Sequence, residues 1–276
     1  MARILAAQLG PKLGKTVIVE NRPGASTMIG AGAVAKGPHD GSLLLMTTPS
    51  TITAAATMKQ VSFDMTKDLA PVAIVGEGPM VIAVSEKSGL ETPADVVAAA
   101  KANPGGLKYG TSGIGTLAHM TFELVSDAGK VKLLHVPYKG ASFALIDLSA
   151  GTIDLMVASY STFDSQVRLG RVRPIAVTSS KASAAFPNLL PMSSAVPGFS
   201  VDIWTAVFAS AKTPPELLTQ LNRAILEISK SREMRAVLDT DGAQPSELTP
   251  EQLQPRLHDS IKMWRKLAED KQISID

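Results

Sequence analysis

Apolar positions follow two spacings along most of the chain. Stretches with apolar residues three and four positions apart, typical of amphipathic helices, alternate with short apolar runs typical of buried strands. Segments rich in Gly, Pro and Asn separate them. Helices are predicted at residues 2–13, 30–36, 92–103, 116–127, 141–150, 214–229, 231–240 and 249–268, and strands at 16–20, 42–46, 72–76, 80–84, 107–110, 132–136, 153–157, 173–178 and 201–209.

This alternation predicts an α/β fold with parallel strands. Because central strands are flanked by helices at both ends of the chain, we expect two lobes, although a single large sheet fits the pattern almost as well. The expected lobes are residues 1–80 plus 203–276 for lobe one and residues 81–202 for lobe two.

Composition narrows the possible functions. The chain has 276 residues, of which 45% are hydrophobic and 19% charged, as in globular proteins. A net charge of +2 without a long basic run argues against nucleic-acid or anionic-membrane partners, and no apolar run is long enough to insert into a membrane. Cysteine is absent, which excludes disulfides and thiolate chemistry. Neither a metal-binding histidine spacing nor a Gly-x-Ser-x-Gly elbow occurs, so we expect no metal, no cofactor and no enzymatic activity.

The segment TSGIGTLAHM, residues 111–120, follows a predicted strand and opens a predicted helix. Its glycines permit unusual backbone conformations, so free N–H groups and the hydroxyls of Ser112 and Thr116 are expected to form an anion cradle around Gly115. The glycines also fit a loose dinucleotide fingerprint, which would indicate a nucleotide-using α/β enzyme. That alternative lacks the acidic residue expected after the next strand. A plain tight turn is the third interpretation.

Two other polar loops follow predicted strands. Thr47, Thr48 and Ser50 form a cluster of hydroxyls, and Pro137-Tyr138-Lys139-Gly140-Ala141 offers a cation and a turn. Open α/β sheets bind ligands at the carboxyl ends of their strands. His119, one turn after Thr116, is more readily a core or capping residue than a ligand. The three loops therefore suit a compact anion held by neutral donors.

The chain also resembles a known family over almost its whole length. Its signature segments, in the order and spacing of the Bug (TctC-type) extracytoplasmic solute receptors, are VIVENRPGAS, GPHDGSLLLMTT, DLAPVAIVG, ANPGGLKYGTSGIGTLAHM, HVPYKGASFALIDLSAGTIDLMVAS, GRVRPIAVTSSKASAAFPNLLPM and VPGFSVDIWTAVFASAKTP. The resemblance implies a two-lobed periplasmic-binding-protein (type II, Venus-flytrap) fold. It also implies a periplasmic receptor that binds a small carboxylate in an interlobe cleft and delivers it to the membrane components of a tripartite tricarboxylate transporter.

The resemblance places the ligand contacts on matching positions. These are Thr47, Thr48 and Ser50 in lobe one, and Ser112, Gly115, Thr116, Lys139, Gly140 and Ala141 in lobe two, where the last turn is expected to contribute a backbone N–H. At Val157-Ala158-Ser159 many relatives have Phe-Asp-Asn, so Ala158 and Ser159 mark a departure. Ala158 lacks a carboxylate that could pair with an amino group, which favours plain carboxylates over amino acids.

A second departure concerns the start of the chain. Members of this family usually begin with a strand and a Pro-Gly-Gly loop before the helix that here starts at Ala2, and no signal peptide opens this sequence. We therefore expect the first strand of lobe one to be missing, with weak ligand affinity and a sheet edge prone to pairing. Apart from such edge pairing, the protein is expected to be a monomer.

Overall fold

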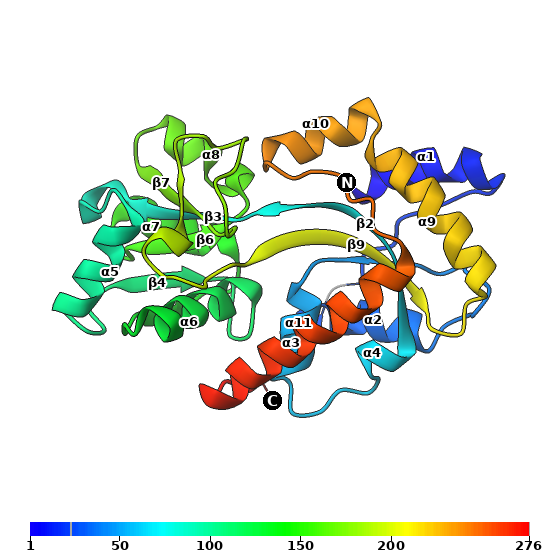
Figure 1. The fold of residues 1–276 in the computed structure, drawn as a ribbon, viewed down its shortest axis with the longest axis horizontal. Coiled ribbons are helices and arrows are strands. Elements are labelled where there is room, and N and C mark those ends of the chain that lie inside the picture. The colour runs from blue at the N-terminus through cyan, green and yellow to red at the C-terminus, as the bar shows by residue number, and fades with distance from the viewer. Residues whose placement is uncertain (23, 276) are drawn as a thin grey trace. The chain divides into compact units, whose positions relative to one another are not determined.

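The computed structural model of the chain describes residues 1–22 and 24–275. Its internal contacts divide it into two compact units. The first comprises Met1–Glu77, Trp204–Asp239 and Ala243–Asp276, and the second comprises Gly78–Ile203 and Thr240–Gly242. The chain passes from the first unit to the second within strand β2 (Leu69–Pro79) and returns within strand β9 (Asp202–Ser210) (Figure 1).

The first unit contains a three-stranded sheet in the order β1-β9-β2, in which β1 (Leu45–Thr47) is antiparallel to β9. Helices α1 and α9 lie side by side, as do α3 and α11 (Figure 1). Leu221, Ile225 and Ile228 of α9, spaced four and three apart, are buried in one apolar cluster with residues of β2 and α1. The helices of this unit are α1 (Ala2–Leu13), α2 (Met28–Ala35), α3 (Ser50–Thr57), α4 (Met65–Asp68), α9 (Pro215–Ser229), α10 (Arg232–Thr240) and α11 (Pro250–Asp270), with a 3₁₀ turn at Ala25–Thr27.

The second unit is built on a six-stranded sheet in the order β5-β4-β6-β3-β7-β8. Strand β4 is parallel to both of its neighbours, β5 and β6, and β7 is parallel to β8, whereas β3 is antiparallel to β6 and β7. The strands are β3 (Val81–Ser85), β4 (Lys108–Thr111), β5 (Leu134–Pro137), β6 (Leu155–Ala158), β7 (Val172–Val177) and β8 (Leu190–Pro191).

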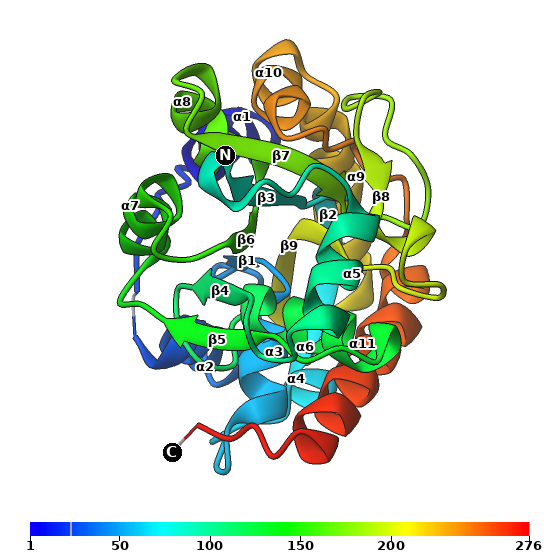
Figure 2. The ribbon, with the colours of Figure 1, turned by 90° about the vertical axis from the view of Figure 1, so that its left-hand side faces the viewer.

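Helices cover both faces of this second sheet. Helices α7 and α6 lie on opposite sides of it (Figure 2). Val81 and Ala83, two positions apart on β3, pack in one cluster with Ala144 of α7 and Phe163 of α8, as the alternation of side chains along a strand requires. The helices of this unit are α5 (Pro93–Ala102), α6 (Leu117–Gly129), α7 (Ala141–Ala150) and α8 (Tyr160–Arg168), with 3₁₀ turns at Glu86–Ser88 and Met192–Ser194.

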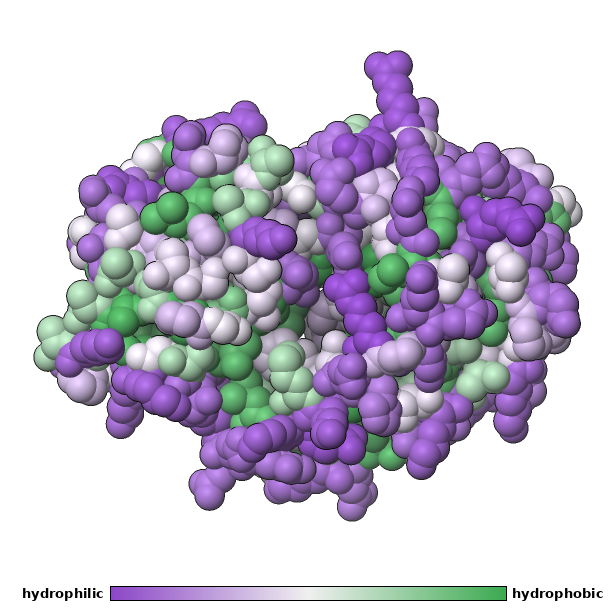
Figure 3. All heavy atoms as spheres, viewed as in Figure 1, coloured by the Kyte–Doolittle hydropathy of each residue, from purple (hydrophilic) through white to green (hydrophobic). Residues whose placement is uncertain are grey.

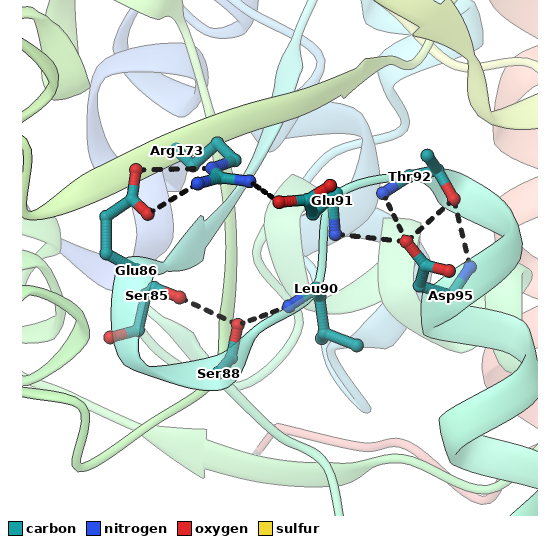
Figure 4. A network of polar contacts seen from close by, with 8 residues as sticks. All are labelled: Ser85, Glu86, Ser88, Leu90, Glu91, Thr92, Asp95 and Arg173. Atoms are coloured by element: carbon teal, nitrogen blue, oxygen red, sulfur yellow. Dashed lines mark hydrogen bonds and ion pairs between the residues drawn. The ribbon is translucent and has the colours of Figure 1, made fainter.

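A polar network ties together one edge of the second sheet (Figure 4). Arg173, at the start of β7, donates to both oxygens of Glu86 at 3.2 and 2.9 Å and also to Glu91. Helix α5 begins with a capping box between Thr92 and Asp95, within the helix predicted at residues 92–103. The Thr92 hydroxyl, together with the nearby backbone N–H groups, holds the pKa of Asp95 below its ordinary value. Because β3 ends and β7 begins here, this is the edge opposite to the carboxyl ends of β5, β4 and β6.

Several predicted elements require correction. Residues 16–20 are not a strand: Ile18 is 82% exposed, and no described strand pairs with this segment. A short run of β-branched residues forms a strand only beside a hydrogen-bonding neighbour. The all-parallel arrangement is also wrong, since β3 follows β2 without a crossover helix and enters the sheet in the opposite direction. Helices α3 and α8 were not predicted, because α3 consists mostly of Thr and Ala and α8 shows its apolar helical spacing over only nine residues.

Polar residues cover much of the face shown in Figure 3, and apolar residues appear there in small groups. Within residues 1–22 and 24–275, no helix combines the length and apolarity needed to cross a bilayer.

Candidate ligand-binding site

Three neighbouring parallel strands of the second unit end at one edge of its sheet, and a helix follows each of them. Register places Thr111 of β4 opposite Pro137 of β5, and Gly110 opposite Met156 of β6. The loops that lead into α6, α7 and α8 therefore start at this edge, where α/β sheets bind ligands. The structure brings eight of the predicted site residues to this edge, namely Ser112, Gly115, Thr116, Lys139, Gly140, Ala141, Ala158 and Ser159.

The loop between β4 and α6 is held by its own hydroxyls. The Gly113 carbonyl accepts hydrogen bonds from Thr111 Oγ1 at 3.0 Å and from Thr116 Oγ1 at 2.8 Å, so both of its lone pairs are used. The Gly113 N–H donates back to Thr111 Oγ1 at 3.2 Å. Gly113 and Gly115 have φ angles of 142° and 72°, which explains the need for glycine at both positions.

Two residues that the sequence predicted as ligand contacts have hydrogen-bond partners within this loop. The one hydroxyl hydrogen of Thr116 is given to Gly113, and its oxygen accepts the His119 N–H at 3.4 Å, so Thr116 caps α6. The Gly115 N–H donates to His119 Nδ1 at 3.0 Å. Both groups therefore have hydrogen-bond partners within the loop itself, and the ligand contacts expected of them from the sequence stay predictions. Ser112 is exposed, and the first-turn N–H groups of Leu117 and Ala118 have no acceptor within the helix.

The β5–α7 loop presents a second helix start. Gly140 is the N-cap of α7, with a φ angle of 140° and no side-chain capping bond, so the first N–H groups of α7 lack intrahelical acceptors. Tyr138 N–H donates to the Thr111 carbonyl at 2.9 Å and so joins this loop to the first. Lys139 is exposed. These positions are compatible with the backbone contact expected at Gly140 and Ala141.

An open pocket of about 390 Å³ lies beside this loop and is lined by Pro137, Tyr138, Lys139, Phe143, Ile146 and Asp147. Phe143 and Ile146 are 58% and 64% exposed. The Tyr138 hydroxyl donates to Asp147 Oδ2 at 2.7 Å, and burial together with this bond raises the pKa of Tyr138 to about 12. The pocket wall is therefore largely apolar, and its tyrosine is uncharged at neutral pH.

The third helix start is already occupied by a carboxylate of the protein. Asp241 Oδ1 accepts the Ser161 N–H at 2.8 Å, within the first turn of α8. Ala158 and Ser159, at the end of β6, are half-buried, and Ser159 makes no side-chain capping bond. Sequence inspection missed Asp241, because it lies 80 positions from its partner.

The first-unit candidates separate into two groups. Thr47 is buried, and its hydroxyl bonds to that of Thr51, which also meets the Thr27 hydroxyl at 2.6 Å. Thr47 therefore has a structural partner. Thr48 and Ser50 are half-exposed, and Ser50 opens α3 after the N-cap Pro49. The expected loop of hydroxyls is thus partly a helix.

Aromatic stacking connects two histidines behind the loop of the second unit. The rings of His119 and His135 lie 3.9 Å apart at 15°, and Tyr109 stacks on His135 at 4.9 Å. Burial lowers the pKa of His119 to about 4, and burial and then His119 lower that of His135 to about 4. From their positions in the sequence, the two histidines were not expected to lie together. The parallel pairing of β4 with β5, which places Tyr109 beside His135, is the signal that could have indicated a ring cluster here. His119 is buried, as a core or capping residue would be. In the part of the chain that the structure describes, no group of three His, Asp or Glu side chains is arranged to hold a metal ion.

Comparison with known proteins gives a consistent result. The chain is 33% identical over 267 residues to the protein BugT of Bordetella pertussis, a match that spans 96% of this chain and 82% of that protein. The solved structure of R. palustris Rpa4515 with adipate has a TM-score of 0.86 and 30% identity, over 99% of this chain and 92% of that one. The periplasmic binding protein BugD has a TM-score of 0.82 and 29% identity, over 99% and 92%.

These neighbours confirm the predicted class of fold, that of the α/β periplasmic binding proteins. The match to the family profile extends over residues 1–273. The chain therefore belongs to the tripartite tricarboxylate transporter family receptors, the TctC family.

Proposed function

We propose that this receptor binds a small carboxylate outside the cytoplasmic membrane and delivers it to the membrane components of a tripartite transporter. The two compact units are then its two lobes. The observation that supports this proposal most directly is the meeting of the α6 and α7 helix starts at one edge of the second sheet. Helix N-termini favour anions, because their N–H groups lack partners and their dipoles are positive at that end.

Neutral donors suit a carboxylate in this position. Hydrogen bonds from N–H groups to an ionised carboxylate contribute roughly 1.5 to 3 kcal/mol each. At the start of α8 the Asp241 side chain already provides such a carboxylate. The starts of α6 and α7 therefore remain for the ligand. Ala158 offers no negative partner for an amino group. Plain carboxylates are therefore favoured over amino acids.

Two relatives support this class of ligand. Rpa4515 was solved with adipate, and MatC from Rhodopseudomonas palustris, which has a TM-score of 0.82 and 25% identity to this chain, was solved with bound malate. Both ligands are dicarboxylates. We propose Thr48, Ser50, Ser112, Lys139, Gly140, Ala141 and Ser159 as the positions that contact the ligand here.

A thermal-shift and calorimetric screen of mono-, di- and tricarboxylates tests the proposal, with adipate and malate included and the uncharged diamide of adipic acid as the control. Stabilisation by at least one carboxylate, and none by the diamide, is expected. If no carboxylate raises the melting temperature and calorimetry detects no heat of binding, the proposal is wrong.

A matched pair of variants locates the site. Ser112→Asp adds a negative charge beside the α6 start and should weaken carboxylate binding by tenfold or more, whereas the neutral, similarly sized Ser112→Asn should change it by less than about threefold. Because an acidic residue suits a helix start, Ser112→Asp should not lower the melting temperature without ligand. Equal affinities in the two variants would place the ligand elsewhere.

A further inference from the structure

We propose that His119 is the positioning residue of the loop between β4 and α6: its neutral Nδ1 accepts the Gly115 N–H and so anchors the loop, and protonation of the ring releases it. This inference goes beyond the proposed function and rests on it for its effect on ligand affinity. Its effect on the loop stands without any ligand.

The geometry fixes which ring nitrogen bears the hydrogen. Because the Gly115 N–H donates to His119 Nδ1 at 3.0 Å, Nδ1 has no hydrogen in the neutral ring, and Nε2 bears it. The backbone N–H of His119 bonds in turn to Thr116 Oγ1 at 3.4 Å. One residue therefore holds the loop at two places, from inside the helix that the loop opens.

A second histidine supports the same loop from β5. His135 Nε2 lies 2.7 Å from Thr111 Oγ1, which also donates to the Gly113 carbonyl at 3.0 Å. With its single hydrogen given to Gly113, the Thr111 hydroxyl accepts from His135 Nε2–H. The stacked pair thus contacts the loop at both of its ends.

Protonation is incompatible with the anchor. A charged His119 would present Nδ1–H to the Gly115 N–H, so two donors would face each other. Two titratable groups face the histidine rings, Tyr109 from β4 and Glu123 from α6. Glu123 Oε1 accepts a hydrogen bond from the Tyr109 hydroxyl at 2.7 Å and lies 3.8 Å from His119 Nε2. Burial keeps the pKa of His119 at about 4 in spite of this carboxylate, so the anchor is intact at neutral pH.

Two substitutions separate anchoring from packing. In His119→Asn the amide oxygen takes the place of Nδ1 as an acceptor and does not titrate, whereas in His119→Leu the acceptor is lost and an apolar side chain fills the space. His258→Asn, on an exposed histidine of α11, is the matched control.

Amide hydrogen exchange of Gly115, corrected for its intrinsic rate, is the first measurement. Protection should fall roughly tenfold in His119→Leu, the effect of one lost hydrogen bond, and should be retained in His119→Asn and His258→Asn. In the parent protein, protection should fall by up to about tenfold per pH unit between pH 6 and 5, because the open loop takes up the proton. It should stay constant in His119→Asn. The amide of Ala83 in β3 reports global opening and should not follow Gly115.

Calorimetry with adipate and malate at pH 7.5 is the second measurement. If the parent protein binds either ligand, the affinity of His119→Leu should be roughly tenfold lower and that of His119→Asn close to the parent. Unchanged Gly115 protection in His119→Leu, equal losses at Gly115 and Ala83, or failure of His119→Asn to restore protection would each overturn the inference. Absence of binding by the parent to every carboxylate would refute the proposed function instead, and the exchange data would still decide the role of His119.

Discussion

Acidification from pH 7 to pH 5 should lower the unfolding free energy of the second unit through its stacked histidines. Both have an ordinary pKa of 6.5 and a pKa of about 4 in the folded protein. The unfolded chain therefore binds more protons than the folded chain between these values, and stability falls as the pH falls through this window. Well above pH 6.5 the rings are neutral in both states, and the effect disappears.

The size of the effect follows from these pKa values. At pH 5 the unfolded imidazole is almost fully protonated and the folded one mostly neutral, so His119 alone should remove about 2 kcal/mol between pH 7 and pH 5. His135 adds a similar amount at most, because the two stacked rings compete for the proton. We expect a total loss of about 2 to 4 kcal/mol, a large part of the stability of an ordinary domain. Asp64 and Asp95, whose pKa values lie below 3.8, titrate outside this window.

Urea unfolding followed by far-ultraviolet circular dichroism at pH 7, 6 and 5 measures the loss. Fluorescence of Trp204 and Trp264 reports only the first unit, so it provides an internal comparison. The double variant His119→Asn/His135→Gln should be less stable at pH 7 but much less sensitive to pH, whereas His258→Asn should follow the parent. An equal dependence on pH in the parent and the double variant would show that the histidine pair is not responsible.

Two other substitutions test the packing and the charges of the second unit. Gly110→Ala should lower the unfolding free energy, measured by urea titration, by about 1 to 3 kcal/mol, because a Cβ there would lie 2.3 Å from Ile153 Cδ1. The control is Gly32→Ala in helix α2, where the added Cβ meets only ordinary contacts and should be neutral or stabilising. Arg173→Met should cost less than about 1 kcal/mol, because that side chain is 38% exposed, and the cost should shrink in high salt; a larger or salt-independent loss would contradict this estimate.

Elements with strong local patterns were predictable from the sequence. The helix predicted at residues 92–103 from its apolar spacing is confirmed as α5, which a capping box of Thr92 and Asp95 starts. The segment 16–20 shows the limit of such reasoning, since its run of β-branched apolar residues is as typical of a strand as that of a true one. Whether such a segment forms a strand depends on a distant partner that local pattern cannot provide. The same holds for the direction of β3, which depends on the path of β2.

The candidate site was predictable in place but not in detail. Strand ends, glycines and hydroxyls in the sequence predicted that the polar loops of the second unit share one edge of its sheet, and they do, because parallel register brings successive loops together. The partner of each polar group depended on long-range contacts: His135 meets Thr111 from 24 positions away, and Asp241 meets Ser161 from 80. The local sequence pattern does not predict these pairs.

The detail has a functional consequence, because a hydroxyl has only one hydrogen to give. Thr116 gives its hydrogen to Gly113, and Thr111 does the same, so neither can also donate to a ligand without breaking the loop. At this loop the proposed carboxylate would then rely on Ser112 and on main-chain N–H groups, and the latter look alike in every sequence. Affinity should therefore depend on how firmly the loop is held and on nearby charge more than on the side chains at its surface. It follows that a buried residue such as His119 can matter more to binding than an exposed one.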